Sequence, residues 1–299
     1  MDANSPLNIF LAVVRERSFT RAAEKLFRTQ QAISLAIQRL ENDLGERLLD
    51  RSGRDLALTE AGRIVYESAR RQENLQRELT SQIEELRNKA IGRLSIGANE
   101  SMTLYLLPHI MAFRRQYPKV KLVVERSRST ELPEKLMAGD VDFGILSYRP
   151  EDDRFESRTL YTDHLSFVVP PDHRLAKRRT VSIRELGMET FVAHNVLSPY
   201  RETVIREFQR QKVQLNVDIE MPTVESIRLM VQAGQGLAFL PRMCVDHDLR
   251  HGLLKEVKVK ELKLERIIHL VRVAKRPLSH AGMAFLETVE TQRKRQGKA

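Results

Sequence analysis

The side chains with the clearest binding chemistry lie together at the expected start of a helix near residue 30. Gln30 and Gln31 can each pair with the N6 and N7 edge of an adenine, and Ser34 can bond a base or a phosphate. The helix would begin after Thr29, and the free amides of a helix N-terminus attract phosphate. This combination predicts a surface that enters the major groove of duplex DNA.

Two arginines flank the tip of an expected hairpin that follows this helix. The turn Ser52-Gly53 separates the apolar pair 48–49 from the strand-like run 56–59, which predicts two antiparallel strands. Arg51 and Arg54 would then reach the DNA backbone or a narrow A·T minor groove, where negative potential is concentrated.

Three short helices are expected to position these groups. The second starts after Ser18 or Thr20, and the third runs from about Gln30 to Leu44 and ends at Gly45. Helices two and three form a candidate helix-turn-helix, although a small helical bundle with a polar turn remains an alternative. The side chains expected to face the core are Leu7, Phe10, Leu11, Val14, Ala22, Ala23, Leu26, Ile33, Ile37, Leu40 and Leu44.

A longer helix is expected from Glu60, capped by Thr59, to about Ala90. One helix of this length cannot bury its own apolar stripe, so a partner helix from a second copy is implied. The stripe consists of Val65, Ala69, Leu75, Leu79, Ile83 and Leu86.

Beyond Gly92, strand-like runs alternate with helical stretches such as 103–117 and 223–233, which argues for an α/β region with mainly parallel strands. A strand, a short loop and a helix N-terminus follow one another near Asn99 and again near Thr223. The expected strands cover 94–98, 120–125, 141–146, 165–169, 191–193, 217–221, 237–240 and 267–273.

Composition narrows the classes of protein. The 299 residues suggest two domains. The single Cys244 makes an intrachain disulfide impossible and a structural zinc site improbable. We therefore expect a reducing, cytoplasmic setting without a membrane span or a metal. The formal net charge of +10 favours polyanionic partners, but residues 1–91 carry 15 basic and 14 acidic side chains, so charge alone does not locate a DNA site.

Motifs of catalysis and of cofactor binding are missing from the sequence. Gly234-Gln235-Gly236 lacks the third glycine of the dinucleotide fingerprint, and no serine stands in a Gly-x-Ser-x-Gly elbow. We therefore expect neither an enzyme nor a cofactor. A solute-binding protein would share the α/β region but has no use for residues 1–90. A nucleoid-packaging protein would explain the positive charge but has no use for the α/β region.

Several runs together resemble the LysR-type transcriptional regulators. The resemblance is continuous over about the first sixty residues, through 18–26, 30–34, 48–51 and 58–62. It extends more loosely along the rest of the chain, through 106–108, 117–118, 139–142 and 234–241.

The resemblance implies an α+β protein that binds double-stranded DNA as a homodimer and that assembles further, as is typical of the family, into a homotetramer. A winged helix-turn-helix would span 1–59, a linker and dimerisation helix 60–91, and an effector-binding domain resembling periplasmic binding proteins 92–299. Its two α/β lobes would be 92–163 with 270–299, and 164–269. Gln30, Gln31 and Ser34 would face bases and Arg54 the groove, while Leu35 replaces a residue that is often basic in the family.

A small-molecule effector, a polar metabolite or a carboxylate, would bind between the lobes, outside the carboxyl ends of the strands. Glu100 and Glu225 beside helix N-termini argue against a purely anionic effector. Ordinary helix capping is the alternative role for Ser101 and Thr223. The residues expected to contact the effector are Asn99, Glu100, Ser101, Ser129, Ser147, His194, Arg201 and Thr223.

Overall fold

Three short helices pack into the N-terminal domain of this computed structural model, which describes residues 5–50, 56–87, 92–196 and 198–296. Each helix starts at a residue whose side chain accepts a backbone N–H bond: Ser5, Ser18 and Thr29. Gly45, with φ of +70°, ends the third helix. The helices are α1 (Pro6–Glu16), α2 (Phe19–Lys25) and α3 (Gln30–Leu44).

The core of this domain confirms most of the expected inward positions. Phe10, Ile33 and Ile37 are fully buried, and Ala22 and Ala23 allow α2 to approach its neighbours closely. Leu44 is an error of the sequence analysis, because its side chain is 48% exposed in the last turn of α3, where the helix has passed the edge of the core.

The expected hairpin forms after α3. Strand β1 (Leu49–Asp50) pairs antiparallel with β2 (Ala57–Leu58), with Leu49 opposite Leu58. The carboxylate of Glu41 accepts bonds from the amides of Leu48 and Leu49 and so fixes the start of the hairpin. The turn between the strands, with Arg51 and Arg54, lies outside the described residues.

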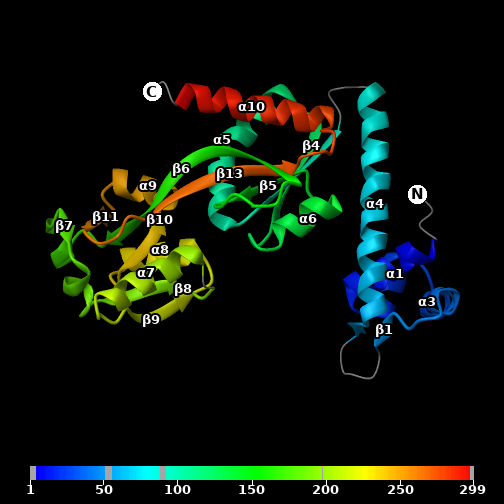
Figure 1. The fold of residues 1–299 in the computed structure, drawn as a ribbon, viewed down its shortest axis with the longest axis horizontal. Coiled ribbons are helices and arrows are strands. Elements are labelled where there is room, and N and C mark those ends of the chain that lie inside the picture. Colours follow the sequence, from blue (N-terminus) through cyan, green and yellow to red (C-terminus); the bar gives the residue numbers. More distant parts are fainter. Residues whose placement is uncertain (1–4, 51–55, 88–91, 197, 297–299) are drawn as a thin grey trace.

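Helix α4 (Glu60–Arg87) leaves the N-terminal domain as a long rod beside the rest of the chain (Figure 1). Its apolar stripe is divided. Val65 packs on the core of the N-terminal domain and Ala69 is buried, whereas Leu75, Leu79 and Ile83 are 46–67% exposed. The side chain of Leu86 lies outside the described residues.

Farther along, α4 contacts the C-terminal region through paired polar groups. Asn74, 6% exposed, donates to the carbonyl of Ala138 and to Oδ1 of Asp140, both at 2.8 Å. Arg70 forms an ion pair with the same carboxylate. These bonds hold α4 against the end of helix α6 (Leu132–Ala138), which lies beside it in Figure 1.

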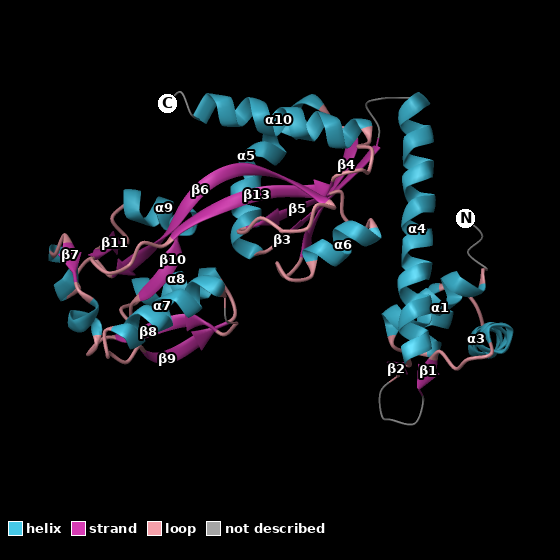
Figure 2. Ribbon diagram, in the orientation of Figure 1, coloured by secondary structure: helices cyan, strands magenta, loops and turns pink. Residues whose placement is uncertain are grey.

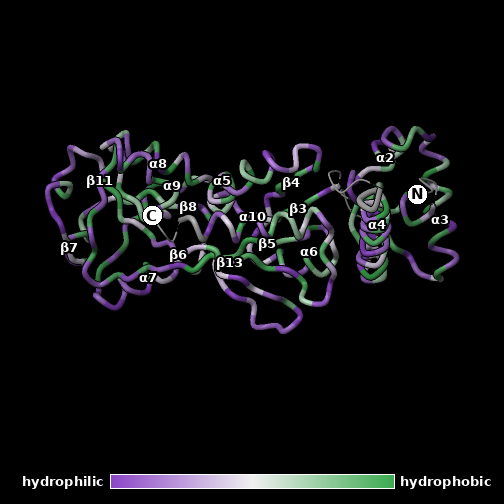
Figure 3. Tube along the Cα trace, turned by 90° about the horizontal axis from the view of Figure 1, so that it is seen from above, coloured by the Kyte–Doolittle hydropathy of each residue, from purple (hydrophilic) through white to green (hydrophobic). Residues whose placement is uncertain are grey.

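The first lobe of the C-terminal region is a sheet covered by helices (Figure 2). Strands β3 (Gly92–Ala98), β4 (Val120–Arg126) and β5 (Phe143–Leu146) are parallel. Helices α5 (Glu100–Gln116) and α10 (His280–Gln296) pack on their core, to which Phe113, Phe143 and Phe285 contribute. In Figure 3 the hydrophobic segments follow β5 and β13 (Glu265–Val273), whereas the outer loops are hydrophilic.

Two long strands run from the first lobe into the second. Strands β6 (Phe155–Val169) and β13 (Glu265–Val273) pair antiparallel with each other over nine residues of β13. The expectation of mainly parallel strands is therefore wrong for this part of the sheet, because a strand that crosses to the other lobe and one that returns must run in opposite directions. Residues 155–164, the first two thirds of β6, were also missed.

The second lobe contains a second parallel pair, β8 (Thr190–His194) and β9 (Asn216–Met221). Strand β10 (Ala238–Pro241) pairs with β6 and so joins this lobe to the long sheet, whose order is β10-β6-β13-β5-β3-β4. The remaining elements are η1 (Arg174–Lys177), β7 (Thr180–Val181), η2 (Ile183–Leu186), α7 (Pro199–Arg210), α8 (Val224–Gln232), α9 (Arg242–Arg250), β11 (Lys255–Glu256) and β12 (Lys258–Val259). No helix within the described ranges is both long and apolar enough to cross a membrane.

Candidate DNA and effector sites

The first turn of α3 presents the predicted base-reading residues on the surface. Gln30 and Gln31 are exposed and Ser34 is partly exposed, while Ile33 and Ile37 on the opposite side anchor the helix in the core. The hydroxyl of Thr29 accepts a bond from the amide of Ala32 at 3.2 Å, so this side chain is the helix cap. The arrangement leaves amide groups of two glutamines available to a groove.

Leu35 and Gln30 add two details to this surface. Leu35 is 48% exposed, so its apolar side chain faces solvent on the same helix. The hydroxyl of Thr20 donates to Oε1 of Gln30 at 3.4 Å, a long contact that links α2 to the start of α3.

The expected effector loops of the first lobe lie at one edge of the sheet, since the carboxyl ends of parallel β3, β4 and β5 meet there. Asn99 is the cap of α5 and accepts bonds from the amide of Met102 and the hydroxyl of Ser101, both at 3.0 Å. Because its hydroxyl donates to Asn99, Ser101 is a partner of the cap rather than the cap itself, and it is 8% exposed.

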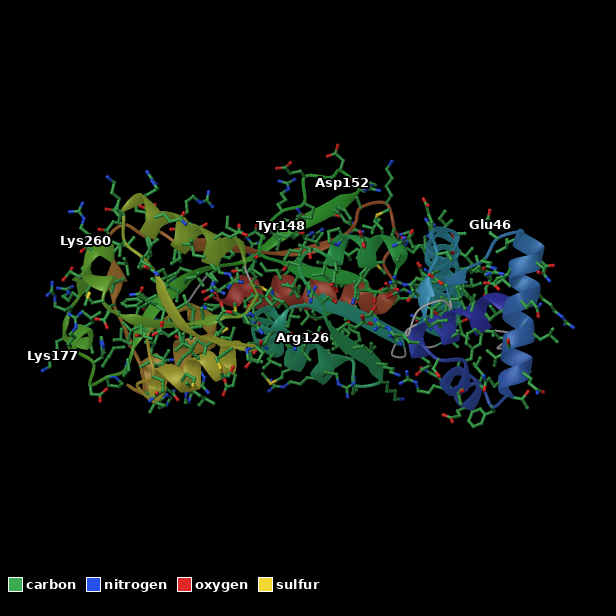
Figure 4. The ribbon with its side chains drawn as sticks, turned by 90° about the horizontal axis from the view of Figure 1, so that it is seen from below. Glu46, Arg126, Tyr148, Asp152, Lys177 and Lys260 are labelled. Atoms are coloured by element: carbon green, nitrogen blue, oxygen red, sulfur yellow. The ribbon has the colours of Figure 1, made fainter. Side chains whose placement is uncertain are left out.

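Two tyrosines bond the other serine loops. The hydroxyl of Tyr148 donates to the carbonyl of Ser129 at 3.0 Å, and that of Tyr200 donates to the carbonyl of Ser147 at the same distance. Figure 4 labels Tyr148 in the middle of the C-terminal region. Because Tyr200 belongs to α7 of the second lobe, its bond to Ser147 brings the loops of the two lobes together.

In the second lobe, the expected residues are largely bonded to their own surroundings. Arg201 donates to the carbonyl of His194 and pairs with Glu220 at 2.7 Å, so only its Nε is left buried without a partner. Thr223 caps α8 by accepting a bond from the amide of Ser226, which agrees with the capping role. Glu225, beside it, pairs with Arg228 at the surface.

Sequence reasoning missed a buried charged pair between the lobes. Asp163 on β6 and Arg266 on β13 are cross-strand partners and are only 3% and 5% exposed. Burial raises the pKa of the Asp163 carboxyl, and the nearby amide of His164 and the positive charge of Arg266 oppose that rise. The expected strands began at Leu165 and Ile267, whereas β6 and β13 begin at Phe155 and Glu265, so Asp163 and Arg266 fell outside the expected strands.

Two hollows on the first lobe lie away from these loops. One is lined by Gln116 of α5 and by residues of α10 such as Thr288 and Thr291. The other lies over β6 and β13, between Arg158 and Leu286. Neither contains a residue of the expected effector set.

Two family models match most of the chain. Residues 5–63 match the family model "Bacterial regulatory helix-turn-helix protein, lysR family", and residues 87–294 match "LysR substrate binding domain". A probable RuBisCO transcriptional regulator of Cyanophora paradoxa is 30% identical over 95% of this chain and 90% of its own length. The RuBisCO operon transcriptional regulator of Allochromatium vinosum is 30% identical over 95% and 94%.

Solved structures share the fold. The LysR family regulator CbnR aligns with a TM-score of 0.72 and 19% identity, covering 96% of this chain and 98% of its own. CbnR bound to its target DNA aligns with a TM-score of 0.71 and 20% identity, again covering 96% of this chain and 98% of its own. The matching helix-turn-helix and substrate-binding models together span most of the chain. It therefore belongs to the LysR family of transcriptional regulators, which bind DNA and small-molecule effectors and oligomerise, and it is not an enzyme.

Proposed function

We propose that this regulator reads its operator with the first turn of α3 and with the hairpin tip. The observation that supports this is the exposure of Gln30 and Gln31 on a helix whose other face is fixed in the core by Ile33 and Ile37. Thr29, Ser34 and Leu35 would contribute phosphate, base and thymine-methyl contacts, and Arg51 and Arg54 would reach the backbone or the minor groove from the hairpin.

We also propose that the chain works in the cytoplasm as a homodimer formed through α4, and that two dimers form a tetramer. The three exposed side chains Leu75, Leu79 and Ile83 recur every four residues along one side of α4 and would be covered by α4 of a second copy. Domain limits of 1–59, 60–91 and 92–299 are part of this proposal, with the two lobes of the last domain divided as 92–163 with 270–299 and 164–269.

The effector would bind between the lobes, among Asn99, Glu100, Ser101, Ser129, Ser147, His194, Arg201 and Thr223. The bond from Tyr200 to the carbonyl of Ser147 supports this place, since the loops of both lobes come within hydrogen-bonding reach of one another there. An effector that closes or opens the lobes would change the spacing of the paired DNA-binding domains and thus the bend of the DNA.

The DNA part is tested by selecting bound fragments from the source genome and footprinting them at low and high salt. We expect Gln31→Ala to weaken specific binding by about 1–3 kcal/mol, the value of one good base contact, and to leave low-salt non-specific binding unchanged. Gln209→Ala is the matched control, because Gln209 is an exposed glutamine on α7, outside the DNA-binding domain and away from α4. Equal footprints for both variants would show that α3 does not read bases.

A further inference from the structure

Phe27 stands in the turn between α2 and α3, in a conformation and an environment that do not suit its side chain. Its backbone φ is +54°, in the left-handed region that glycine and asparagine adopt most readily. Its side chain is 96% exposed, the highest value among the large hydrophobic side chains of the described residues. Neither the packing nor the backbone geometry of the fold explains a phenylalanine at this position.

The turn that carries Phe27 is closed by two backbone bonds. The amide of Phe27 donates to the carbonyl of Glu24 at 3.2 Å, and the amide of Arg28 donates to the carbonyl of Ala23 at 2.9 Å. Helices commonly end in this way at a left-handed residue. Leu26, one residue earlier, packs against the core of the domain. The ring of Phe27 therefore leaves the domain from a fixed point of the backbone.

This point lies beside the surface proposed to read the operator. Phe27 precedes Thr29, the cap of α3, by two residues and Gln30 by three, and residues 27–31 are all exposed. The contact between Thr20 and Gln30 also holds α2 against the start of α3. When the second helix of such a motif enters the major groove, the first helix crosses the DNA backbone. The turn that joins α2 to α3 would then lie next to that backbone.

The chemistry of a phenyl ring limits what Phe27 can contact there. The ring has no N–H or O–H group, so it cannot bond a phosphate, but it can pack on the apolar face of a sugar. We propose that Phe27 packs against a deoxyribose at the edge of the groove and so fixes how α3 is seated in it. This inference rests on the proposed function, since it assumes that α3 lies in the groove. Because the sugar is the same in every sequence, the contact strengthens binding without a base preference.

Two substitutions remove the ring and suit the backbone of the turn: Phe27→Gly and Phe27→Asn. Each is expected to bind the selected genomic fragments and a random-sequence duplex about tenfold more weakly, the effect of losing about half the burial of a phenylalanine. The Tm of the full chain should stay unchanged or rise, because both residues relieve the left-handed strain. The salt dependence of binding should not change, because an apolar contact releases no counterion. Fluorescence anisotropy titrations at several salt concentrations and thermal denaturation measure these effects.

The second lobe offers a matched control for the backbone. Lys212, also exposed, has φ of +56°, and its turn after α7 is closed by the same pattern of bonds, from Lys212 to Gln209 and from Val213 to Phe208. Lys212→Asn relieves the same strain, so it should leave DNA binding unchanged and affect the Tm as Phe27→Asn does.

Two further variants test the side chain itself. Phe27→Leu keeps an apolar group at the turn and should bind DNA within about threefold of the unchanged chain. Met188→Ala removes an apolar side chain that is 91% exposed in the second lobe and should not alter DNA binding.

Several results would overturn the sugar contact. Unchanged binding of Phe27→Gly and Phe27→Asn to both DNAs would assign the exposed ring to a protein partner. A loss for Phe27→Gly alone would show that a flexible turn, and not the missing ring, weakens binding. A lower Tm for both variants would show that the ring packs within the fold, and a loss on the selected fragments alone would assign Phe27 to base reading.

Comparison with Gln31→Ala separates this inference from the proposed function. If the Phe27 variants bind normally while Gln31→Ala loses its footprint, the sugar contact is wrong and the reading of bases by α3 stands. If the Phe27 variants bind weakly while Gln31→Ala keeps its footprint, the turn lies on DNA but α3 does not read bases.

Discussion

Two buried polar regions of this protein are built in opposite ways. Where α4 meets the first lobe, buried polar groups have partners: Asn74 bonds Ala138 and Asp140, and Arg276 donates to the carbonyls of Leu136 and Met137 at 2.8 and 3.0 Å. Where the two lobes meet, the charged side chains of Asp163 and Arg266 are only 3% and 5% exposed and, among the described residues, form no ion pair with each other. A paired junction holds one geometry, whereas unpaired groups favour any change that supplies their partners.

The difference has a mechanical consequence. The α4 junction connects the DNA-binding domain to α6, and α6 leads directly into β5, which ends at the residue before Ser147. A fixed junction can pass a movement of the first lobe to α4 with little loss. The unpaired region is then the place where such a movement would start.

The largest effect is expected at the paired junction. Asn74→Ala removes the donor to the carbonyl of Ala138 and to the carboxylate of Asp140, and should lower the free energy of unfolding by about 1–3 kcal/mol. Urea denaturation of the full chain measures the loss, and hydrogen exchange should increase in residues 132–142. Gln76→Ala, an exposed amide on the same helix, should cost less than about 0.5 kcal/mol. Equal losses for both would mean that the junction is not rigid.

The DNA-binding end was the more predictable of the two ends of this molecule. Its elements are set by local signals: the caps at Ser18 and Thr29 and the left-handed Gly45 appear in the sequence within a few residues of the helices they delimit. Leu44 was misjudged because its periodicity continues past the edge of the core, which a pattern cannot locate.

The region between the lobes was not predictable in the same way. Asp163 and Arg266 meet only because β6 and β13, distant in the sequence, pair antiparallel. A charged residue in a buried strand contradicts the usual pattern, and the expected strands, 165–169 and 267–273, left both residues out. The tyrosines that bond Ser129 and Ser147 were also missed, because a bond from a side chain to a backbone carbonyl leaves no periodic pattern in the sequence.

A third buried polar group, His109, is expected to make stability depend on pH. His109 of α5 is fully buried beside Tyr105, and neither ring nitrogen has a partner, so burial lowers the pKa of His109 below its usual 6.5. The folded state keeps this ring neutral while the unfolded chain takes up a proton as pH falls through about 6.5. Stability should therefore be complete above that pH and decline below it, by at most about 1.4 kcal/mol per pH unit.

The contribution of His109 is isolated by comparison with His109→Phe. Phenylalanine cannot titrate, and an aromatic ring of similar shape can pack against Tyr105. Denaturation midpoints measured between pH 5 and 8 should fall more steeply on acidification for the unchanged chain than for the variant. Parallel curves would show that the buried ring finds a partner, such as water, for its proton.

The smallest effect is expected for the two tyrosine bonds to the serine loops. Tyr200→Phe and Tyr148→Phe each remove a hydroxyl that donates to a serine carbonyl at 3.0 Å, so each should cost about 0.5–1.5 kcal/mol at most. They differ in place, because Tyr148 bonds Ser129 within the first lobe and Tyr200 bonds Ser147 across the lobes. Hydrogen exchange should therefore increase near Ser147 and in residues 194–201 for Tyr200→Phe, and only in the first lobe for Tyr148→Phe. If both variants loosened only the first lobe, the lobes would be held together by the packing around β6 and β13 rather than by the bond from Tyr200.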